Sequence, residues 1–196
     1  KRPFDIVVAS VALILLAPLF AGIAVLIKLD SPGPVIFRQR RQGFNQRVFR
    51  IFKFRTMTTL DDGDVIAQAK AGDLRITAIG AKLRRWNIDE LPQLLNVLRG
   101  DMSIVGPRPH AIAHDRLFEK QIEAYPRRLN VKPGITGWAQ AHGFRGETDT
   151  EEKLRGRLEH DLHYIDNWSI WLDIFIIVLT IISPKAYRNA LWAAAS

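Results

Sequence analysis

The chain contains no cysteine among its 196 residues. This absence excludes disulfide bonds and thiolate chemistry, and it agrees with a cytoplasmic location. The sequence also lacks the glycine-rich fingerprint of dinucleotide-binding folds, the P-loop of nucleotide hydrolases and the serine elbow of acyl hydrolases. Any chemistry of this chain must therefore rest on other residue types.

Histidine is scarce, and its spacing does not complete a metal motif. His110 and His114 are four residues apart, as metal ligands can be, but no glutamate follows His110. His160 and His163 are similarly close together. We therefore interpret these side chains as surface or capping residues rather than as zinc ligands.

Acidic residues are in the minority, with Asp+Glu 20 against Lys+Arg 28, which gives a net charge of +8 and a pI of about 10.1. This basic balance suits nucleic acid, anionic lipid or a phosphorylated small molecule as a partner. The length fits one domain. Because the sequence starts at Lys1 without a methionine, we expect it to be a piece of a longer protein.

Charge is missing entirely from residues 6 to 27, a run long enough to cross a bilayer as a helix. Both flanks are basic, with Lys1 and Arg2 before the run and Lys28, Arg38, Arg40 and Arg41 after it. Lys and Arg collect on cytoplasmic flanks. We expect a re-entrant helix that bends at Pro18 and leaves the membrane by the face it entered; a plain span is the alternative.

A second apolar stretch, residues 168–183, is interrupted by Asp173 and is too short to span a bilayer. Trp168, Trp171 and Trp192 lie in or near it, and tryptophan favours the headgroup level. We predict an interfacial helix. A buried core helix is the alternative. Both interpretations are compatible if one face of the helix is buried and the other faces the membrane.

Between these segments the pattern predicts a mixture of helix and strand. Residues 35–57 read as a hairpin with Gly43 and Asn45 in its turn, residues 60–73 as a loop, and residues 100–109 as a strand and turn. Helices are expected up to Arg85, over 110–125 and from Thr150 onward. Residues 132–150 read as a glycine-rich loop. In the second hairpin strand, Lys53 and Arg55 would share one face with Phe49 and Ile51.

Two neighbouring carboxylates, Asp89 and Glu90, precede a short apolar helix. Leu91, Leu94, Leu95 and Leu98 mark one helix face, and Gly100 can end that helix in a left-handed conformation. The two acids would then lie at its N-terminus, where the helix dipole favours negative charge. Taken alone, the pair is explained by capping.

The surroundings of the pair indicate phosphoryl chemistry instead. Phosphoryl transfer needs cations that offset the phosphate oxygens, and arginine is suited to bidentate phosphate contacts. Mg²⁺ uses one or two carboxylates together with phosphate oxygens and water. A carboxylate also serves as a nucleophile.

The segments "KFRTM" (53–57), "LRRWNIDELPQLLNVLRGDMSIVGPRPH" (83–110) and "KPGITGWAQ" (132–140) resemble the bacterial sugar transferases, the monotopic polyprenyl-phosphate phosphoglycosyl transferases. The resemblance runs from "KRPFD" at the start through "DSPGPV" (30–35) to about residue 182. It implies a catalytic domain in which an aspartate attacks the β-phosphate of a UDP-sugar and releases UMP. Undecaprenyl phosphate then accepts the phosphosugar.

Carried over, Asp89 is the nucleophile, and Glu90 assists as a base or as a second ligand of Mg²⁺. The resemblance makes phosphate-facing cations of Lys53, Arg55, Arg85 and Arg108, and nucleotide-sugar contacts of Gln140 and Arg145. It implies an α/β (α+β) fold: a re-entrant membrane helix over residues 1–30 and a compact, mostly helical catalytic domain over 31–196, with an interfacial C-terminal helix. The location implied is the cytoplasmic face of the bacterial inner membrane.

The sequence departs from the family where Ala17-Pro18 replaces the usual Ser-Pro at the helix break; an alanine cannot bond a freed carbonyl. "GFRGETDT" (143–150) resembles members that transfer glucose-1-phosphate, with galactose or an acetamido sugar as alternatives. A nucleic-acid-binding protein would use "RVFRIFKFR" (47–55) but leaves the acidic pair without a role. A non-catalytic membrane scaffold is the third reading, and homo-oligomer formation stays open.

Overall fold

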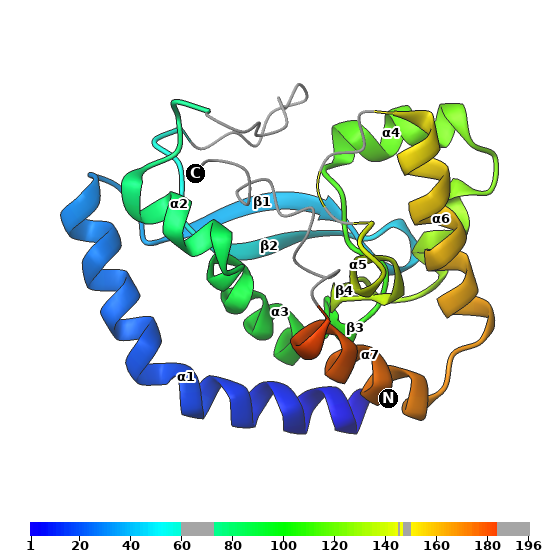
Figure 1. Cartoon of the computed structure of the whole chain (residues 1–196), viewed down its shortest axis with the longest axis horizontal. Helices are drawn as coiled ribbons and strands as arrows, with labels where there is room; N and C mark the ends of the chain where they lie inside the picture. The colour runs from blue at the N-terminus through cyan, green and yellow to red at the C-terminus, as the bar shows by residue number, and fades with distance from the viewer. Residues whose placement is uncertain (60–72, 145, 147–149, 184–196) are drawn as a thin grey trace.

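The computed structural model describes residues 1–59, 73–144, 146 and 150–183. Helices dominate it, and the strands form two small two-stranded sheets, so the expected α/β fold with a small hairpin is confirmed (Figure 1). The elements are α1 (Arg2–Asp30), β1 (Ile36–Gln42), η1 (Phe44–Gln46), β2 (Val48–Phe54), α2 (Ala78–Arg85), η2 (Ile88–Gln93), α3 (Leu94–Arg99), β3 (Ser103–Val105), α4 (Ile112–Gln121), η3 (Tyr125–Asn130), β4 (Gly134–Thr136), α5 (Trp138–Ala141), α6 (Glu151–Asp166) and α7 (Ile170–Ile182).

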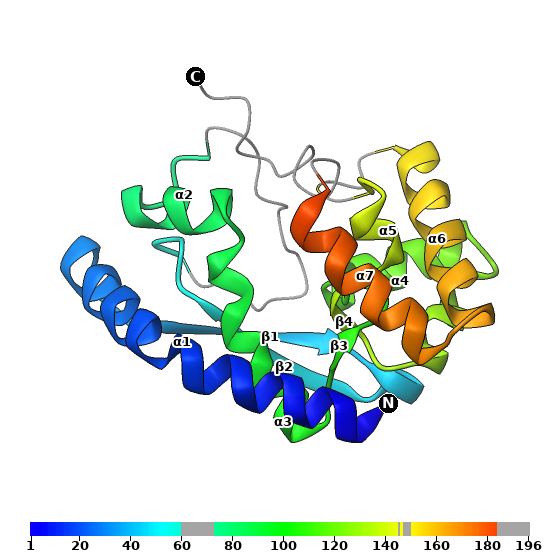
Figure 2. The ribbon, with the colours of Figure 1, turned by 60° about the horizontal axis from the view of Figure 1, so that its bottom comes forward.

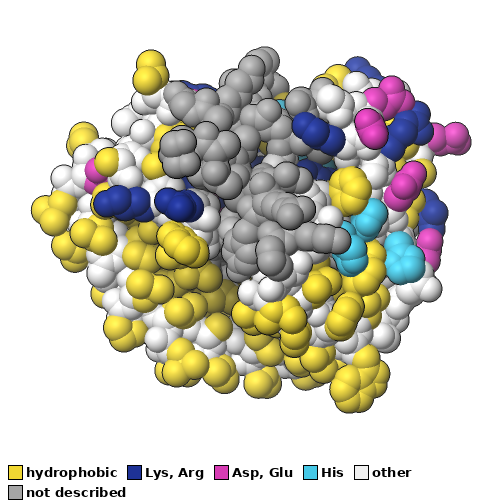
Figure 3. Space-filling model, in the orientation of Figure 1, with side chains coloured by type: hydrophobic (Ala, Val, Ile, Leu, Met, Phe, Trp, Pro, Cys, Tyr) yellow, Lys and Arg dark blue, Asp and Glu magenta, His cyan; other side chains and the backbone are white. Residues whose placement is uncertain are grey.

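The helix α1 bends near its middle and runs along the edge of the molecule (Figures 1 and 2). Pro18 lies inside it, where it removes one backbone hydrogen bond and crowds the preceding turn. By length and composition α1 is able to cross a membrane. Much of its apolar surface is exposed, including Ile14 and Leu15 at 73% each. Hydrophobic side chains accordingly gather along the lower edge in Figure 3.

One face of α1 is nevertheless fixed to the rest of the fold. Asp5, 3% exposed, accepts hydrogen bonds from the hydroxyl of Ser103 (2.9 Å to Oδ2) and from the backbone N–H of Ile104 (3.1 Å). Ala9 is fully buried in the main core together with side chains from β2, α3, β3, α6 and α7. The apolar helix α1 is therefore packed against the strand β3.

The helix α7 has one buried face and one exposed face. The interfacial helix and the buried core helix that its sequence suggested are compatible with such an arrangement. Its inner face buries Ile176 and Asp173, whose carboxylate accepts hydrogen bonds from Lys1 Nζ (2.8 Å), Tyr164 Oη (2.7 Å) and Trp168 Nε1 (3.2 Å). Its outer face exposes Trp171 and other apolar side chains. Figure 2 shows that α7 begins beside the start of α1.

The hairpin agrees with its predicted turn. β1 and β2 pair antiparallel from Ile36 opposite Phe54 to Gln42 opposite Val48, and Asn45 adopts the left-handed conformation with φ 52°. Lys53 lies opposite Phe37 on the hairpin face that packs against η2. The hairpin therefore delivers one lysine to the segment that carries the acidic pair.

The short apolar helix expected after the acidic pair is present as α3, but it begins at Leu94 and does not include Leu91 or Pro92. A short 3₁₀ helix, η2, contains the pair and Pro92, and the six-residue α3 follows it. No side-chain hydrogen bond caps η2, whose N-cap residue is Asn87. Leu95, expected on the buried face, is 42% exposed, whereas Asn96 and Val97 are fully buried. Gly100 ends α3 with φ 91°, as predicted.

The helices predicted before Arg85, within 110–125 and after Thr150 are confirmed as α2, α4 and α6. The strand β4 was not predicted; it pairs parallel with β3 inside the segment that reads as a glycine-rich loop. The backbones of these two strands touch, since a Cβ on Gly134 would lie 2.1 Å from the nitrogen of Gly106. The predicted loop 60–73 lies, except for Asp73, outside the described residues.

Candidate active site

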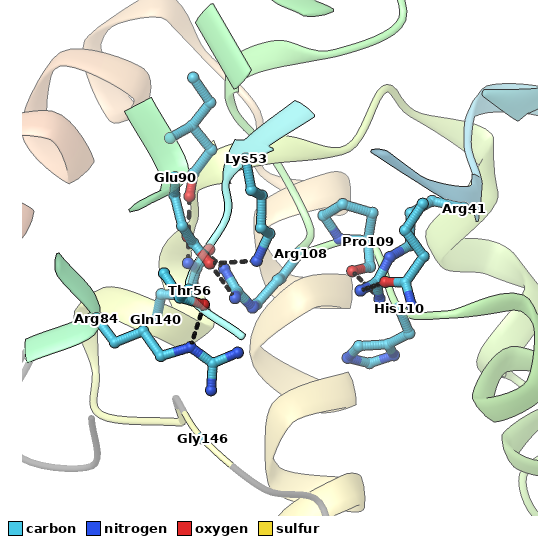
Figure 4. Close-up of polar contacts among 12 residues, drawn as sticks. Arg41, Lys53, Thr56, Arg84, Glu90, Arg108, Pro109, His110, Gln140 and Gly146 are labelled. Carbon is cyan, nitrogen blue, oxygen red and sulfur yellow. Dashed lines mark hydrogen bonds and ion pairs between the residues drawn. The ribbon is translucent and has the colours of Figure 1, made fainter. Parts of the chain in front are cut away.

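Glu90 is held by two cations from distant parts of the chain. Lys53 Nζ on β2 lies 2.8 Å from Glu90 Oε1, and Arg108 Nη1 lies 2.8 Å from Oε2. Arg108 Nη2 donates to Oε1 as well, so the guanidinium contacts both oxygens. Figure 4 shows Lys53 and Arg108 converging on the Glu90 carboxylate. Glu90 therefore has a fixed orientation.

Asp89 has different surroundings although it is the next residue. Its side chain is 7% exposed, and no hydrogen bond or ion pair reaches its carboxylate from the part of the chain that the structure describes. Burial, followed by the negative charge of Glu90, raises the pKa of Asp89 against the opposing effect of three nearby cations. A buried carboxylate without a donor has lone pairs available for an electrophile.

The backbone around Arg108 explains how the guanidinium reaches the pair. Pro107 and Pro109 restrict the chain on either side of Arg108. Pro107 accepts a hydrogen bond from Gly134 N (3.0 Å), and Arg128 Nη2 donates to the carbonyl of Arg108 (2.8 Å). The contact between β3 and β4 therefore fixes the start of this loop, and Arg128 fixes its middle.

The pKa values of the two cations shift in opposite directions. Burial lowers the pKa of Lys53, and Glu90 offsets this in part. Burial also opposes the charge of Arg108, but the Glu90 carboxylate and its hydrogen bonds outweigh burial, so the pKa of Arg108 is raised. Arg108 is a permanent cation, whereas Lys53 is the cation whose charge depends on pH.

A third cation near the pair is Arg84 rather than the expected Arg85. Arg84 Nε donates to Thr56 Oγ1 (2.8 Å), and its charge acts on Asp89 and Glu90 (Figure 4). Arg85 is exposed, and its guanidinium lies 6.0 Å from the centre of the Trp86 ring. Helical periodicity is the signal that separates them, because Arg84 lies four residues, about one turn, after the buried Gly80 on α2.

Arg55 lies away from the pair, contrary to the face that the strand period gives it. It follows the last residue of β2, and its guanidinium donates to the carbonyls of Ser31 (2.6 Å), Pro32 and Ile27 (3.3 Å). Carbonyls at a helix C-terminus lack backbone partners, and a cation satisfies them well. The structure thus places Arg55 at the end of α1.

Gln140 is 3% exposed and lies on α5, whose N-cap residue is Gly137. Its Nε2 donates to the carbonyl of Ile135 (3.2 Å), whereas its Oε1 is buried without a partner among the described residues. Such an acceptor suits a hydroxyl or amide donor of a ligand. Arg145, the other expected nucleotide-sugar contact, lies outside the described residues.

His110 is buried, so its interpretation as a surface or capping residue was wrong. Its Nδ1 lies 2.6 Å from Tyr125 Oη, and its Nε2 lies 3.0 Å from Arg157 Nη1. The described residues contain no group of three or more metal-ligating side chains.

The acidic pair alone does fit a cation that takes most of its ligands elsewhere. Mg²⁺ is often held by one or two carboxylates and completes its shell with substrate phosphates and water. Asp89 offers oxygens that no described residue engages, and Glu90 places a second carboxylate beside them. The donor set is entirely oxygen, as a hard cation prefers.

The family model for bacterial sugar transferases matches residues 1–184 of the chain. The chain belongs to the bacterial sugar transferase family. Among curated relatives of this family, a protein of Xanthomonas campestris pv. campestris is 56% identical over 95% of the chain. One of Escherichia coli (strain K12) is 53% identical over 92% of the chain. Both are named UDP-glucose:undecaprenyl-phosphate glucose-1-phosphate transferase.

Family members differ in the sugar that their names state and in their length. A relative from Aeromonas hydrophila, 47% identical over 92% of the chain, is named a UDP-N-acetylgalactosamine-undecaprenyl-phosphate N-acetylgalactosaminephosphotransferase. The chain spans about two fifths of these three relatives, 39% of the first two and 42% of the third. The chain thus matches only one part of each of these longer relatives.

Proposed function

We propose that the chain transfers glucose-1-phosphate from UDP-glucose to undecaprenyl phosphate and releases UMP. The observation that carries this proposal is the contrast between the two neighbouring carboxylates. Glu90 is bonded to Lys53 and Arg108, whereas Asp89 is buried with no donor from the described residues. One acid organises cations, and the other is left for reaction with an electrophilic phosphorus.

In the first step a carboxylate oxygen of Asp89 attacks the β-phosphorus of UDP-glucose. The bond from that phosphorus to the bridging oxygen breaks, and the oxygen leaves as part of UMP. An acyl phosphate then links Asp89 to glucose-1-phosphate. Lys53 and Arg108 offset the charge on the phosphate oxygens, and Glu90 keeps both cations in place.

In the second step a phosphate oxygen of undecaprenyl phosphate attacks the same phosphorus. The bond between phosphorus and the Asp89 oxygen breaks, which restores the carboxylate and forms undecaprenyl-diphosphate-glucose. Each step exchanges one phosphorus–oxygen bond for another, so no oxidant or reductant is needed. The products suit the start of exopolysaccharide assembly, and a relative from Rhizobium leguminosarum bv. phaseoli is named an exopolysaccharide production protein.

We include Mg²⁺ in the proposal, held by Asp89 and Glu90 together with the diphosphate. When bound, the ion would offset the charge that develops on the diphosphate. The chain's own contribution is separate from it: Lys53, Arg84 and Arg108 orient the phosphates. Activity that EDTA removes and Mg²⁺ restores would support this part of the proposal; full activity in excess EDTA would contradict it.

The membrane placement is part of the same proposal. The exposed apolar surface of α1 and the outer face of α7 suit the bilayer, where the lipid acceptor resides. We place α1 in one leaflet as a re-entrant helix, with the catalytic residues on the cytoplasmic side of the inner membrane. The bend in Figure 1 supports this arrangement.

The test is release of UMP by purified protein given undecaprenyl phosphate and one UDP-sugar at a time: glucose, galactose, N-acetylglucosamine or N-acetylgalactosamine. We expect turnover with UDP-glucose. In the absence of acceptor, UDP-glucose labelled in its β-phosphate should transfer the label to the wild-type protein and leave Asp89→Asn unlabelled. Lack of UMP release with every sugar would refute the function, and label on Asp89→Asn would refute the nucleophile.

A further inference from the structure

A buried polar cluster lies behind Arg108 and takes no part in the proposed chemistry. Its members are each less than 10% exposed and come from four segments of the chain: His110, Asp115 on α4, Tyr125 and Arg128 on η3, and Arg157 and Asp161 on α6. Charged groups are costly to bury unless they bond to one another. A cluster of this size therefore needs an explanation.

The hydrogen bonds of the cluster determine the protonation of His110. Tyr125 has one hydroxyl proton and donates it to Asp115 Oδ1 (2.6 Å), so its oxygen accepts from Arg128 Nη1 (2.9 Å) and from His110 Nδ1–H (2.6 Å). Arg128 Nη1 also lies 3.2 Å from His110 Nδ1, so the proton on Nδ1 follows from the other ring nitrogen. Arg157 Nη1 is able only to donate, and it lies 3.0 Å from Nε2. The imidazole is therefore neutral. Burial, together with Arg128 and Arg157, lowers the pKa of His110 well below its usual value, which agrees.

The guanidinium of Arg157 connects this histidine to the glycine-rich segment. Nη1 donates to His110, Nε donates to the carbonyl of Phe144 (3.0 Å), and Nη2 donates to the carbonyl of Gly146 (2.9 Å). The ring of Phe144 also packs directly on α6, since a Cβ at Gly156 would lie 2.4 Å from it. All three arms of the guanidinium are thus engaged.

The same cluster holds the backbone of Arg108. Arg128 Nη2 donates to the Arg108 carbonyl (2.8 Å), and Arg128 Nε donates to Asp161 (2.8 Å), which lies four residues after Arg157 on α6. Residues one turn apart lie on the same helix face. One face of α6 therefore fixes both the loop that presents Arg108 and the carbonyls of Phe144 and Gly146.

We propose that Arg157 is a positioning residue for the nucleotide-sugar. It fixes the backbone carbonyls of Phe144 and Gly146 relative to Arg108, and His110 connects the two sides. This inference rests on the proposed function, because it assumes that both segments meet one UDP-sugar. Arg157 touches neither the acidic pair nor the reacting phosphorus. A planar guanidinium reaches three acceptors at fixed angles, whereas lysine offers a single ammonium.

The first experiment compares Arg157→Lys with Arg155→Lys in UMP release. Arg155 lies on the same helix, is 55% exposed and pairs with Glu151, so its variant matches the chemical change outside the cluster. We expect Arg157→Lys to raise the KM for UDP-glucose about tenfold or more and to leave kcat within about threefold. Arg155→Lys should behave as wild type.

Two variants of His110 test the connection itself. In His110→Gln the amide oxygen can take the place of Nε2 and accept from Arg157. In His110→Asn the amide nitrogen can take the place of Nδ1 and donate to Tyr125, but no acceptor remains for Arg157. We expect the KM of His110→Asn to follow that of Arg157→Lys and the KM of His110→Gln to stay closer to wild type. A purely structural cluster would lower Tm in both variants without separating their KM values.

Hydrogen exchange of peptides covering residues 140–150 tests the anchoring without any substrate. We expect faster exchange in Arg157→Lys and His110→Asn than in Arg155→Lys or wild type. Unchanged exchange in both cluster variants, or unchanged KM in an active Arg157→Lys enzyme, would overturn the inference. Absence of UMP release by the wild type overturns the proposed function instead, so the two failures are distinct.

Discussion

Asp89 carries a charge that the fold disfavours. Because burial and Glu90 raise its pKa, ionised Asp89 destabilises the folded state at pH values above that pKa, and the cost declines as the pH falls through it. Asp89→Asn should therefore raise Tm at pH 7 while it lowers UMP release at least about a thousandfold. Calorimetry and a UMP assay on one preparation check both effects. A lower Tm would show that the charge is stabilising, and retained turnover would remove Asp89 as nucleophile.

The pH profile of kcat/KM should have an acid limb set by Asp89 and an alkaline limb set by Lys53. Protonation of Asp89 removes the nucleophile, and its raised pKa puts this acid limb above the pH of an ordinary aspartate. Deprotonation of Lys53 removes a phosphate-facing charge, and its pKa, lowered by burial, puts the alkaline limb below that of an ordinary lysine.

Lys53→Arg provides the control for the alkaline limb. An arginine keeps its charge throughout the accessible range, so an active Lys53→Arg enzyme should lose the alkaline limb or show it at higher pH. The acid limb should stay where it is. An alkaline limb unaffected by this substitution would assign it to another group.

How far the sequence predicts the site depends on the residue. The family motifs bring Lys53, Glu90 and Arg108 to one place, and the contacts agree. The motifs do not resolve Arg84 from Arg85, because neighbouring arginines differ only in which side of α2 faces the pair. The period of two carries Arg55 to the wrong location, since β2 has ended by then and the carbonyls at the end of α1 attract the guanidinium.

At the level of elements, α2 supplies a matched pair of arginines. Arg84 bonds to Thr56 and acts on Asp89, whereas Arg85 is exposed beside Trp86. Arg84→Ala should reduce kcat/KM about tenfold or more, as expected when one charge-assisted contact is lost, and Arg85→Ala should change it less than about twofold. UMP release measures both. Equal effects of the two variants would contradict the assignment of Arg84.

The helix α1 makes a prediction about topology. If it is re-entrant, cysteines placed at Pro3 and Pro34, both exposed, lie on the cytoplasmic side. The chain has no other cysteine, so an impermeant maleimide should label neither position in intact cells and both after permeabilisation. Pro18→Leu removes the break and should favour a straight span, which moves the Pro3 position outside. Labelling at Pro3 in intact cells without Pro18→Leu would exclude the re-entrant arrangement.

The strand β4 was not predictable for a physical reason: it has only three residues, the first of them Gly134, which is too few for a periodic signal. The spacing of leucines predicted the short helix α3 but not where it begins. The longer helices were predictable, α1 from its uncharged run over residues 6–27 and α6 from apolar periodicity over several turns. Asn96 shows the limit of such patterns: it is fully buried and bonds to Phe52 N (2.9 Å) and to the carbonyl of Arg50 (2.7 Å), contacts that only the tertiary fold creates.

At the scale of the whole molecule, Asp173 connects three helices. It is 1% exposed and accepts from Lys1 of the α1 N-cap, Tyr164 of α6 and Trp168 before α7. Asp173→Ala leaves these donors without their acceptor, so we expect a loss of about 3 kcal/mol in the free energy of unfolding.

The control is Asp166→Ala, which removes a carboxylate 53% exposed and paired with Arg127. Surface pairs contribute about 0 to 1 kcal/mol, so its transition should stay close to wild type. Chemical unfolding in detergent followed by tryptophan fluorescence measures both variants. Equal unfolding midpoints for the two would show that the buried junction contributes little.

The bond from Asp5 to Ser103 has a consequence for the order of events during synthesis. Asp5 leaves the ribosome 98 residues before its partner, which at about 5–20 residues per second is a delay of about 5–20 s. During that time the start of α1 carries a carboxylate whose final hydrogen-bond donors have not yet been synthesised. The helix α1 therefore reaches its final position only after β3, the strand that leads to Arg108, has emerged.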